Sequence, residues 1–325
     1  MAGITGQGTT FNLPNYVGEL FGISPEDTPF LTAIGGLTGG RSAQAKRFDW
    51  EFYDLRAPAE RDRLEGAAAP SADNRVRSND HNVVQIIHEA VSVSYTKLAA
   101  VGQRDGTGVP AGSNPVTNEY DRQVSQALKA IARDTENAFV NGSFLEPADN
   151  TVARRTRGLL QAITTNVKDM SNTVPTVDDI LDLLQEAYFN GGLQEGETRT
   201  LMVGPGARRL LTKLFVNNFA AGYFGTDRNI GGTKVTSIET DFGNLNIMLN
   251  RFMPHNEIVA VSLEDCAPVM LEIPGKGFLF LEPLAKTGSS QDAQIYGEIG
   301  LEYGNQRKHA KMINVDTKSG GLLGS

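Results

Sequence analysis

The sequence predicts a mixed α+β protein, with helices concentrated in the middle of the chain. Three observations indicate this class. Apolar and polar residues alternate near residue 50, as in a half-buried strand. Between residues 115 and 141, apolar residues recur at steps of three and four, as in a helix. After residue 269, several strand-like runs follow one another.

Composition sets the limits on class and compartment. With 325 residues, 40% hydrophobic and 21% charged, the chain fits a soluble globular protein of one or two compact units. A net charge of −8 argues against a surface built to bind nucleic acid. Cys266 is the only cysteine, so no intramolecular disulfide forms and a reducing compartment is expected. Because no membrane-spanning run and no secretion leader are visible, we expect synthesis in the cytosol.

The first element is an arm over residues 1–47, rich in Gly, Thr and Pro, which we expect to lie over another surface. The run RFDWEF, residues 47–52, then places three aromatic side chains on one face and two acids on the other, and predicts a strand. The run AVSVSY, residues 90–95, repeats the pattern, with Val91, Val93 and Tyr95 on the apolar face. Two strand-like segments therefore bracket a charged insert.

The insert from Arg56 to Asp80 has 25 residues, whose large apolar side chains are Leu64 and Val76 alone. Its five Arg are balanced by five Asp or Glu, and the signs alternate in the run ERDRLE. A loop of this length usually has a function or is disordered. Alternating charges suit pairing with a complementary surface. A contact loop and a disordered insert both remain open on this evidence.

A long helix is predicted over residues 115–141, with Gly142 as its stop. At about 1.5 Å per residue it would be roughly 40 Å long. One face carries charged residues and the other is expected to be buried. The charged positions are Arg122, Lys129, Arg133 and Glu136, and the inward ones are Tyr120, Val124, Ala127, Leu128, Ile131, Thr135, Ala138 and Phe139.

A mixed α/β unit is predicted over residues 165–270. Its first helix begins after Thr176, whose side chain can cap the amide of Asp179, and ends at Gly191. We expect its inward face to be Ile180, Leu183, Leu184, Ala187 and Tyr188. The strand TLMVG leads through Pro205 into the helix GARRLLTKLFVNNF, and the strands VMLEI, GFLFLEPL and IYGEIGLEYG close the chain, the last two joined by the turn KTGSSQDAQ.

The chain shows no recognisable catalytic, metal-binding or cofactor-binding motif. Its four histidines, His81, His88, His255 and His309, lack metal-ligand spacing, and no glycine-rich phosphate loop is present. The acidic pair Asp178–Asp179 is explained by a helix N-terminus. An enzyme therefore remains an open reading at this point, without support from these residues.

Arg154, Arg155 and Arg157 form the densest basic cluster. Guanidinium groups suit both phosphate and carboxylate partners. In a chain that is acidic overall, a solvated or interface-pairing role is favoured over nucleic-acid recognition.

The order of elements resembles the Hong Kong 97-type fold of tailed-bacteriophage major capsid proteins. Within this fold, the sequence is most similar to the branch found in the podophage SU-ten and many actinobacterial phages. The runs that carry this similarity are ISPEDTPFLTAI in the arm and DWEFYDL followed by Glu65-Gly66. Further phrases are RRTRGLLQAITTN, DFGNLNIMLNRFMP and LAKTGSSQDAQIYGEIGLEYGNQRKHAKMINV, so the resemblance spans about residues 20 to 315.

The resemblance implies a division of the chain into named parts: an N-terminal arm 1–47, an extended loop 48–96, a peripheral domain 97–164 with a spine helix at 115–141, an axial domain 165–270, and return strands with the tail 271–325. It also implies that the extended loop contacts a neighbouring subunit. The expected contact residues are Arg56, Glu60, Arg61, Asp62, Arg63, Glu65, Arg75 and Arg77, with Arg154, Arg155 and Arg157 as a second possible interface cluster.

The resemblance further implies a structural protein without catalysis, metal or cofactor. It would self-assemble into pentamers and hexamers of an icosahedral shell around double-stranded DNA, without sequence-specific DNA binding. Portal and scaffolding or decoration proteins are the other expected partners, and no membrane is involved. The location would be the virion capsid, assembled in the bacterial host cytoplasm. A same-fold nanocompartment shell for protein cargo is the first alternative, and a soluble α/β enzyme or ligand-binding protein the second.

Overall fold

The computed structural model describes residues 26–53, 55, 58–71, 77–99, 119–194, 197–218, 237–285 and 288–317. These residues form two compact units. The smaller unit contains residues 26–27, 88–99, 119–130, 281–285 and 288–295, and the larger one contains the remaining described residues. Each unit is described by itself.

In the smaller unit, strand β4 (Gln85–Ser94) leads directly into helix α2 (Tyr95–Ala99). Val91 and Val93 are buried, as the alternating pattern predicts. The same prediction was wrong for Tyr95, which is the first residue of α2 and is 41% exposed. Its amide donates to the carbonyl of Ser289 over 3.0 Å, so the chain turns into a helix where the alternation would have continued.

The larger unit is built around a six-stranded sheet in the order β5-β13-β9-β6-β8-β7. The pairs β5–β13 and β6–β8 are parallel, and the other three pairs are antiparallel. Its strands are β5 (Val167–Thr173), β6 (Arg199–Val203), β7 (Ser237–Thr240), β8 (Gly243–Leu249), β9 (Ile258–Ser262) and β13 (Ala310–Val315). The sheet thus combines the predicted α/β segment with one strand from the C-terminal part of the chain.

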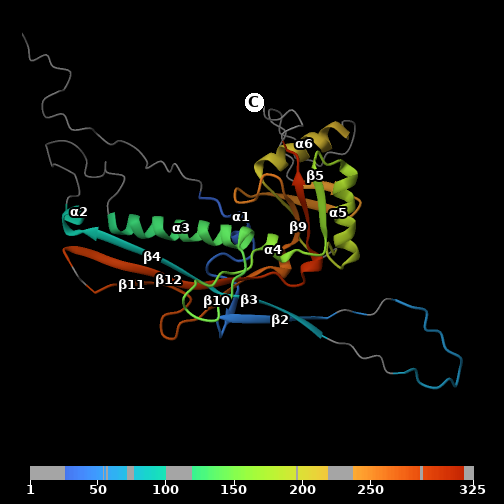
Figure 1. Cartoon of the computed structure of the whole chain (residues 1–325), viewed down its shortest axis with the longest axis horizontal. Coiled ribbons are helices and arrows are strands. Elements are labelled where there is room, and N and C mark those ends of the chain that lie inside the picture. Colours follow the sequence, from blue (N-terminus) through green and yellow to red (C-terminus); the bar gives the residue numbers. More distant parts are fainter. Residues whose placement is uncertain are drawn as a thin grey trace, which may run out of the picture. The chain divides into compact units, whose positions relative to one another are not determined.

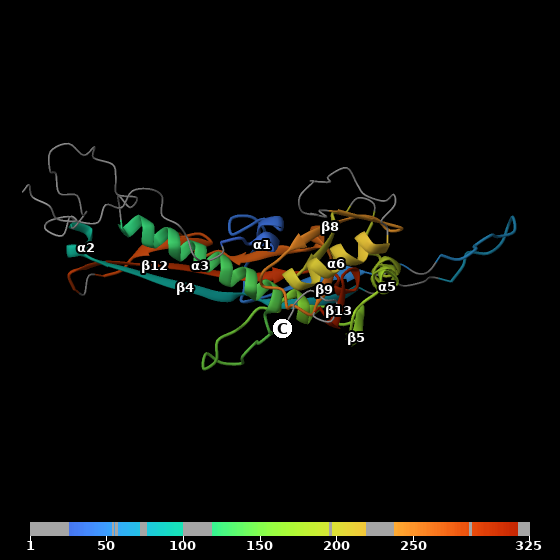
Figure 2. The ribbon, with the colours of Figure 1, turned by 90° about the horizontal axis from the view of Figure 1, so that it is seen from above.

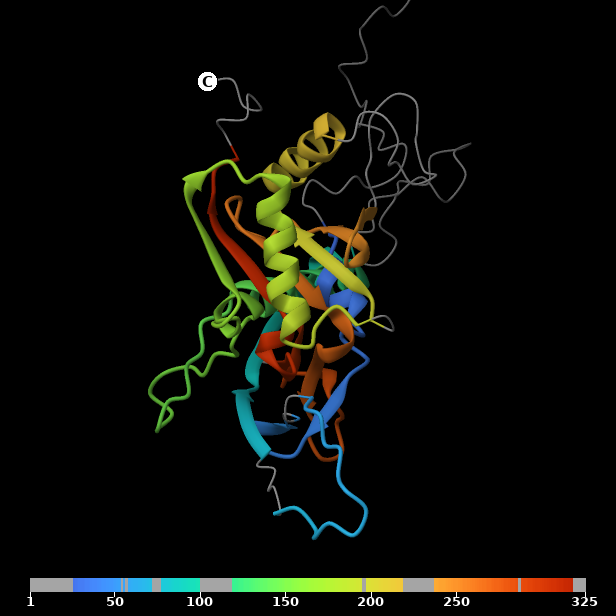
Figure 3. The ribbon, with the colours of Figure 1, turned by 90° about the vertical axis from the view of Figure 1, so that its right-hand side faces the viewer.

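Both faces of this sheet are covered. Each strand supplies side chains to both, because successive strand residues point to opposite sides. On one face, Leu201 and Val203 pack with apolar residues of helices α5 (Val177–Phe189) and α6 (Pro205–Asn218). On the other face, Met202 packs with Phe139 and with Phe30. Figure 3 shows α5 along the sheet, and Figure 1 shows α6 close to it.

The two helices of the α/β segment form as predicted. Thr176 and Asp179 make a reciprocal capping box at the start of α5, and Pro205 is the first residue of α6. Gly191 follows α5 with a φ of 85°, which favours glycine. Four of the five expected inward residues of α5 are buried, but Tyr188 is 53% exposed. Its ring is tilted by 45° against that of Phe242, with the centroids 5.7 Å apart.

Helix α3 (Glu119–Asn141) confirms the predicted long helix within the described residues; residues 115–118 lie outside them. Ala127, Ile131, Thr135 and Phe139 are buried, which matches the expected inward stripe. Two residues differ from expectation. Leu128 is 39% exposed, and Glu136, expected on the charged face, is fully buried.

Glu136 is buried because helix α1 (Pro29–Ala33) begins against its carboxylate. That carboxylate accepts hydrogen bonds from the amides of Phe30 at 3.0 Å and Leu31 at 2.6 Å, and from Asn250 Nδ2 at 2.6 Å. Two of the amides that α1 leaves without an intrahelical partner are therefore satisfied by a residue more than 100 positions away.

A second sheet has the order β1-β10-β12-β11, with β4 also paired to β12. Ser290–Gln294, expected in a turn, belong to β12, so the joining turn is shorter than predicted. The remaining elements of this region are β1 (Arg41–Ala43), β10 (Ala267–Leu271), β11 (Leu279–Pro283), β12 (Ser290–Glu302), helix α4 (Leu159–Ala162) and the 3-10 turns η1 (Leu263–Asp265) and η2 (Gln306–Lys308).

A two-stranded hairpin leaves the larger unit, formed by β2 (Arg47–Tyr53) and β3 (Arg77–Val83) (Figure 1, blue and cyan). The β2 alternation is confirmed, since Phe48, Trp50 and Phe52 are the less exposed positions. The second arm differs from expectation. It is the polar run RSNDHNV rather than AVSVSY, which lies in β4 and pairs with β12. The loop between the arms is therefore shorter than the predicted insert.

Candidate intersubunit contact site

The base of the hairpin is fixed to the larger unit by a buried asparagine. Asn82 is fully buried, and its amide makes four hydrogen bonds. Nδ2 donates to the carbonyls of Leu301 at 2.7 Å and Arg157 at 3.1 Å, and Oδ1 accepts from the amides of Arg157 at 2.8 Å and Val83 at 2.9 Å. One side chain thus ties β3 to two other segments, using its full hydrogen-bonding capacity.

Aromatic and charged groups complete this anchor. The indole of Trp50 donates to the carbonyl of Gly304 over 2.8 Å and packs edge-on against Tyr303, with ring centroids 4.9 Å apart. The Tyr303 hydroxyl donates to Asp80 Oδ2 at 2.8 Å and accepts from Arg157 Nη1 at 2.6 Å. Burial, together with the bond to Asp80, raises the pKa of Tyr303, so its hydroxyl stays protonated.

The predicted arginine cluster divides into two roles. The Arg157 guanidinium pairs with Asp80 at 3.2 Å and lies over the Phe144 ring, 4.5 Å from its centroid. Arg154 donates to the Val84 carbonyl at 2.6 Å and forms an ion pair with Glu298. Both are therefore partly buried and paired within the chain.

Arg155 differs from its two neighbours. Its backbone bridges to Leu145, with N–O distances of 3.0 and 3.1 Å, and its residue is exposed. Of the three predicted interface arginines, Arg155 is the one presented to solvent.

Beyond the hairpin, the loop is exposed at every described position. All residues from Pro58 to Ser71 are exposed, and Leu64, the one large apolar side chain among them, is 86% exposed. At the tip, the amide of Ala67 donates to the carbonyl of Leu64 over 3.1 Å, and Gly66 has a φ of 80°. That geometry is a β-turn with a positive φ at its third residue, which explains the Glu-Gly pair noted in the sequence.

The expected contact residues gather on this loop. Glu60, Arg61, Asp62, Arg63 and Glu65 are exposed, and Arg63 donates to the carbonyl of Ala68 over 3.3 Å. Arg77 lies in β3 and pairs with Glu51 at 2.6 Å across the hairpin. Arg56 and Arg75 lie outside the described residues. The structure therefore brings five of the eight predicted charges together on one exposed loop.

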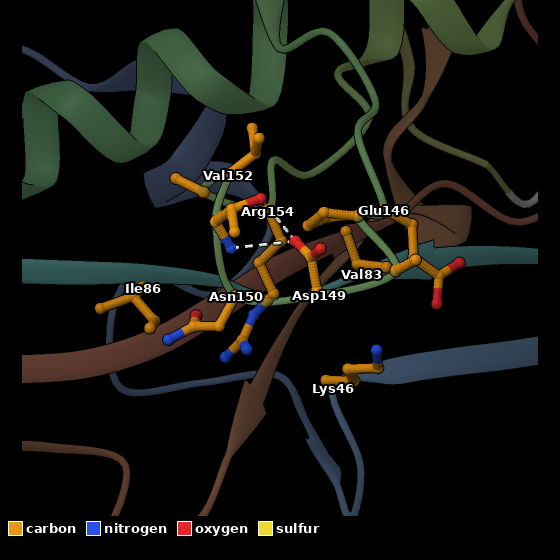
Figure 4. Close-up of a pocket in the computed structure, with 12 residues that line it drawn as sticks. Lys46, Val83, Ile86, Glu146, Asp149, Asn150, Val152 and Arg154 are labelled. Atoms are coloured by element: carbon orange, nitrogen blue, oxygen red, sulfur yellow. Dashed lines mark hydrogen bonds between the residues drawn. The ribbon is translucent and has the colours of Figure 1, made fainter.

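Close to the hairpin base is a groove of about 500 Å³, which was not predicted from the sequence. One wall is the segment 146–154 that follows α3, seen in green in Figure 2, and the other includes Lys46, Val83 and Ile86. Figure 4 shows these side chains around the hollow, with Asp149 bonded to Thr151. Those bonds lower the pKa of Asp149, so its carboxylate is charged at neutral pH.

The groove combines apolar and charged groups. Ile86 is 48% exposed and Val152 is 51% exposed, both unusually open for large apolar side chains. Glu146 and Asp149 supply negative charge, and Lys46 supplies positive charge at the other wall. Arg47 Nη1 lies 3.8 Å from Glu146, while Nε of the same side chain forms the nearer ion pair with Asp49 at 2.8 Å.

The other titratable groups singled out by the sequence have structural environments. His309 is fully buried, with Nε2 bonded to the carbonyl of Tyr303 at 2.8 Å and Nδ1 accepting from the amide of Ser262 at 3.3 Å. Burial lowers its pKa. Burial likewise raises the pKa of the Cys266 thiol. Across the described ranges, no cluster of three or more His, Cys, Asp or Glu could hold a metal ion.

Within the part of the chain that the structure describes, no helix combines the length and apolar character that crossing a bilayer requires.

Known structures share this fold at low sequence identity. The capsid asymmetric unit of cyanophage A-1(L) superposes with a TM-score of 0.67 at 10% identity, covering 95% of this chain and 99% of that chain. The capsid of cyanophage P-SCSP1u gives 0.61 at 11% identity, with 96% of each chain covered. The SrpI encapsulin of Synechococcus elongatus gives 0.56 at 13% identity, covering 94% of this chain and 93% of that chain.

A search of the curated proteins found no match by sequence. The sequence model of one family, described as SU10 major capsid protein, matches residues 3–316. That match covers nearly the whole chain, and the hairpin, long helix and two sheets described above are the fold of the phage capsids named here. The chain therefore belongs to the SU10 major capsid protein family and is a structural protein of the phage capsid shell.

Proposed function

We propose that the chain forms the pentamers and hexamers of an icosahedral shell that encloses the double-stranded DNA of a tailed phage, and that its extended loop lies against a neighbouring subunit. The loop supports this proposal most directly. From Pro58 to Ser71 it is exposed at every position, including Leu64, while its base is held by buried hydrogen bonds. A firmly held hairpin that ends in an unburied loop suits a contact made with another molecule.

The parts of the chain take the roles that the family resemblance implied. Residues 1–47 serve as the arm, 48–96 as the extended loop, 97–164 as the peripheral domain with its spine helix at 115–141, 165–270 as the axial domain, and 271–325 as the return strands and tail. The six-stranded sheet with α5 and α6 supports a separate axial domain. In this assignment β13 completes the axial sheet from the last segment.

In the contact itself, the alternating charges of the loop pair with a neighbour. Arg61, Arg63, Glu60, Asp62 and Glu65 take part, with Arg77 stiffening the hairpin through Glu51. Arg56 and Arg75 keep the role predicted from the sequence. Arg155 is the member of the basic cluster offered to a partner, while Arg154 and Arg157 hold the hairpin base through their own chain.

The overall charge fits a wall around DNA. A net charge of −8 disfavours tight contacts to phosphate, so the packaged genome is enclosed without sequence-specific binding. Portal and scaffolding or decoration proteins are the further partners of such a shell, which assembles in the bacterial host cytoplasm.

A nanocompartment shell for protein cargo is the competing proposal, and the likeness to an encapsulin favours it. That likeness concerns the fold alone, at 13% identity and a lower TM-score than the cyanophage A-1(L) capsid. The family match, which names a major capsid protein, favours the phage shell.

Electron microscopy of particles that contain this chain, with a nucleic-acid assay on the same particles, separates the two. Closed shells that contain double-stranded DNA are expected. Closed shells with defined protein cargo and no nucleic acid would favour the nanocompartment, and a uniform particle of one to four copies would refute a shell of either kind.

Replacing residues 58–71 by a short Gly-Ser turn tests the loop. The replacement leaves β3 intact, because Arg77 to Asn79 are paired with β2. Since all of the residues removed are exposed, the thermal unfolding temperature of the subunit is expected to change little. Shell formation is expected to be lost. Normal shells from this variant would contradict the proposed role.

A further inference from the structure

The loop tip and the groove complement each other chemically. The tip presents Leu64 at 86% exposure between Arg63 and Glu65. The groove presents Ile86 and Val152, each about half exposed, between the carboxylates of the 146–154 wall and the amine of Lys46. The tip is therefore one apolar side chain between opposite charges, and the groove is an apolar hollow between opposite charges. Such an anchor in a pocket is the arrangement that dominates protein interfaces.

The size of the groove matches the tip. Its volume of about 500 Å³ falls in the range of pockets that hold a ligand of a few residues. The tip is compact, because the bond from Ala67 to Leu64 closes a turn and Ala67 to Ala69 are small. Arg63 also bonds back to Ala68, so little ordering is needed on docking.

The tip does not fill the groove of its own chain, because none of residues 58–71 lines it. Lys46 and Val83, which line the groove, lie at the base of the hairpin, where Arg47 pairs with Val83. The loop leaves at the other end, where Tyr53 pairs with Arg77. Six register steps at about 3.3 Å separate these ends by roughly 20 Å, and the paired strands hold them apart. A second copy can bring the same tip to the groove without folding the loop back along its own hairpin.

We propose that the tip of one subunit, Arg63 to Ala67, docks into the groove of a neighbouring subunit, with Leu64 between Ile86 and Val152, Arg63 facing Glu146 and Asp149, and Glu65 facing Lys46. This inference rests on the proposed function and deepens it, because it names the surface that receives the loop. It also gives the 146–154 segment a role, as the wall that closes over the docked tip.

A pair of cysteines tests the contact in assembled shells. Leu64→Cys combined with Val152→Cys places two thiols at the proposed contact, and the native Cys266 is buried and does not interfere. After mild oxidation, a denaturing gel without reductant is expected to show multimers up to closed rings. Each single variant, and the control pair Leu64→Cys with Tyr188→Cys, which is exposed on α5, are expected to show monomers. Shells of normal size that give monomers alone, or equal multimers from the control pair, would overturn the docking.

A charge exchange gives a second readout if the double-cysteine chain does not assemble. Arg63→Glu is expected to reduce the assembled fraction about fivefold, and adding Glu146→Arg to restore it. Absence of restoration, with wild-type shells forming normally, would overturn the docking while leaving the shell function intact. Failure of the wild-type chain to form any shell would instead contradict the proposed function.

Discussion

Replacing Asn82 by alanine tests whether the hairpin base is held as described. The side chain is fully buried and makes four hydrogen bonds, so the truncation leaves the amides of Val83 and Arg157 without the acceptor that they have here. A buried donor without a partner costs about 1–3 kcal/mol, and the carbonyls of Leu301 and Arg157 also lose a donor. We therefore expect Asn82→Ala to lower the free energy of unfolding by about 3–5 kcal/mol.

The assay is urea unfolding of purified, unassembled subunits. For a slope of about 3 kcal/mol per M, the midpoint is expected to fall by about 1–1.7 M. Asn79→Ala is the matched control, since it removes the same side chain from the same strand at an exposed position, where its bond to Asp49 is 3.4 Å long. That variant should stay within about 0.5 kcal/mol of wild type. Equal midpoints for the two variants would refute the view that Asn82 anchors the hairpin.

Three further results are expected. Asp179→Ala removes half of the α5 capping box and should cost about 1 kcal/mol near neutral pH. Hydrogen bonds from Thr176 lower the pKa of Asp179 to about 2. The stabilisation is therefore complete above the pKa of the unfolded chain and is lost as the pH falls toward 2. At that pH the unfolding curves of variant and wild type should converge. Glu136→Gln should cost about 2–4 kcal/mol and speed hydrogen exchange at Phe30 and Leu31; unchanged exchange would contradict the carboxylate anchor. Cys266 should react with a thiol reagent only on unfolding, and rapid labelling of the native chain would contradict its burial.

Elements that depend on neighbouring residues could be predicted from the sequence. The capping box at Thr176 and Asp179 is local, and so is the alternation along β2. Strand β3 could not be found in this way, because RSNDHNV has neither alternation nor β-branched residues except its last. It is a strand because β2 lies beside it, and that contact is not visible in its own residues.

Tertiary contacts also determine which charged side chains are buried and paired. Glu136 follows Thr135 on α3 and was placed on the outer face, but α1 and Asn250 cover it. The arginine cluster was recognised as significant, yet the partners of Arg154 and Arg157 are 144 and 77 positions away in the sequence. A single sequence shows which charges are available, and the fold determines which of them are already paired.

The loop from Pro58 to Ser71 contributes no buried side chain to its own subunit. If the loop docks on a neighbouring subunit as proposed, changes there alter the association of subunits without altering the stability of each one. In a closed ring of six, the same weakened contact is repeated six times. A loss of about 0.5 kcal/mol per contact, small for an exposed charge pair, adds up to about 3 kcal/mol per ring, which is a factor of more than 100 in the equilibrium. Substitutions too small to detect in the monomer can therefore set the protein concentration at which shells begin to form.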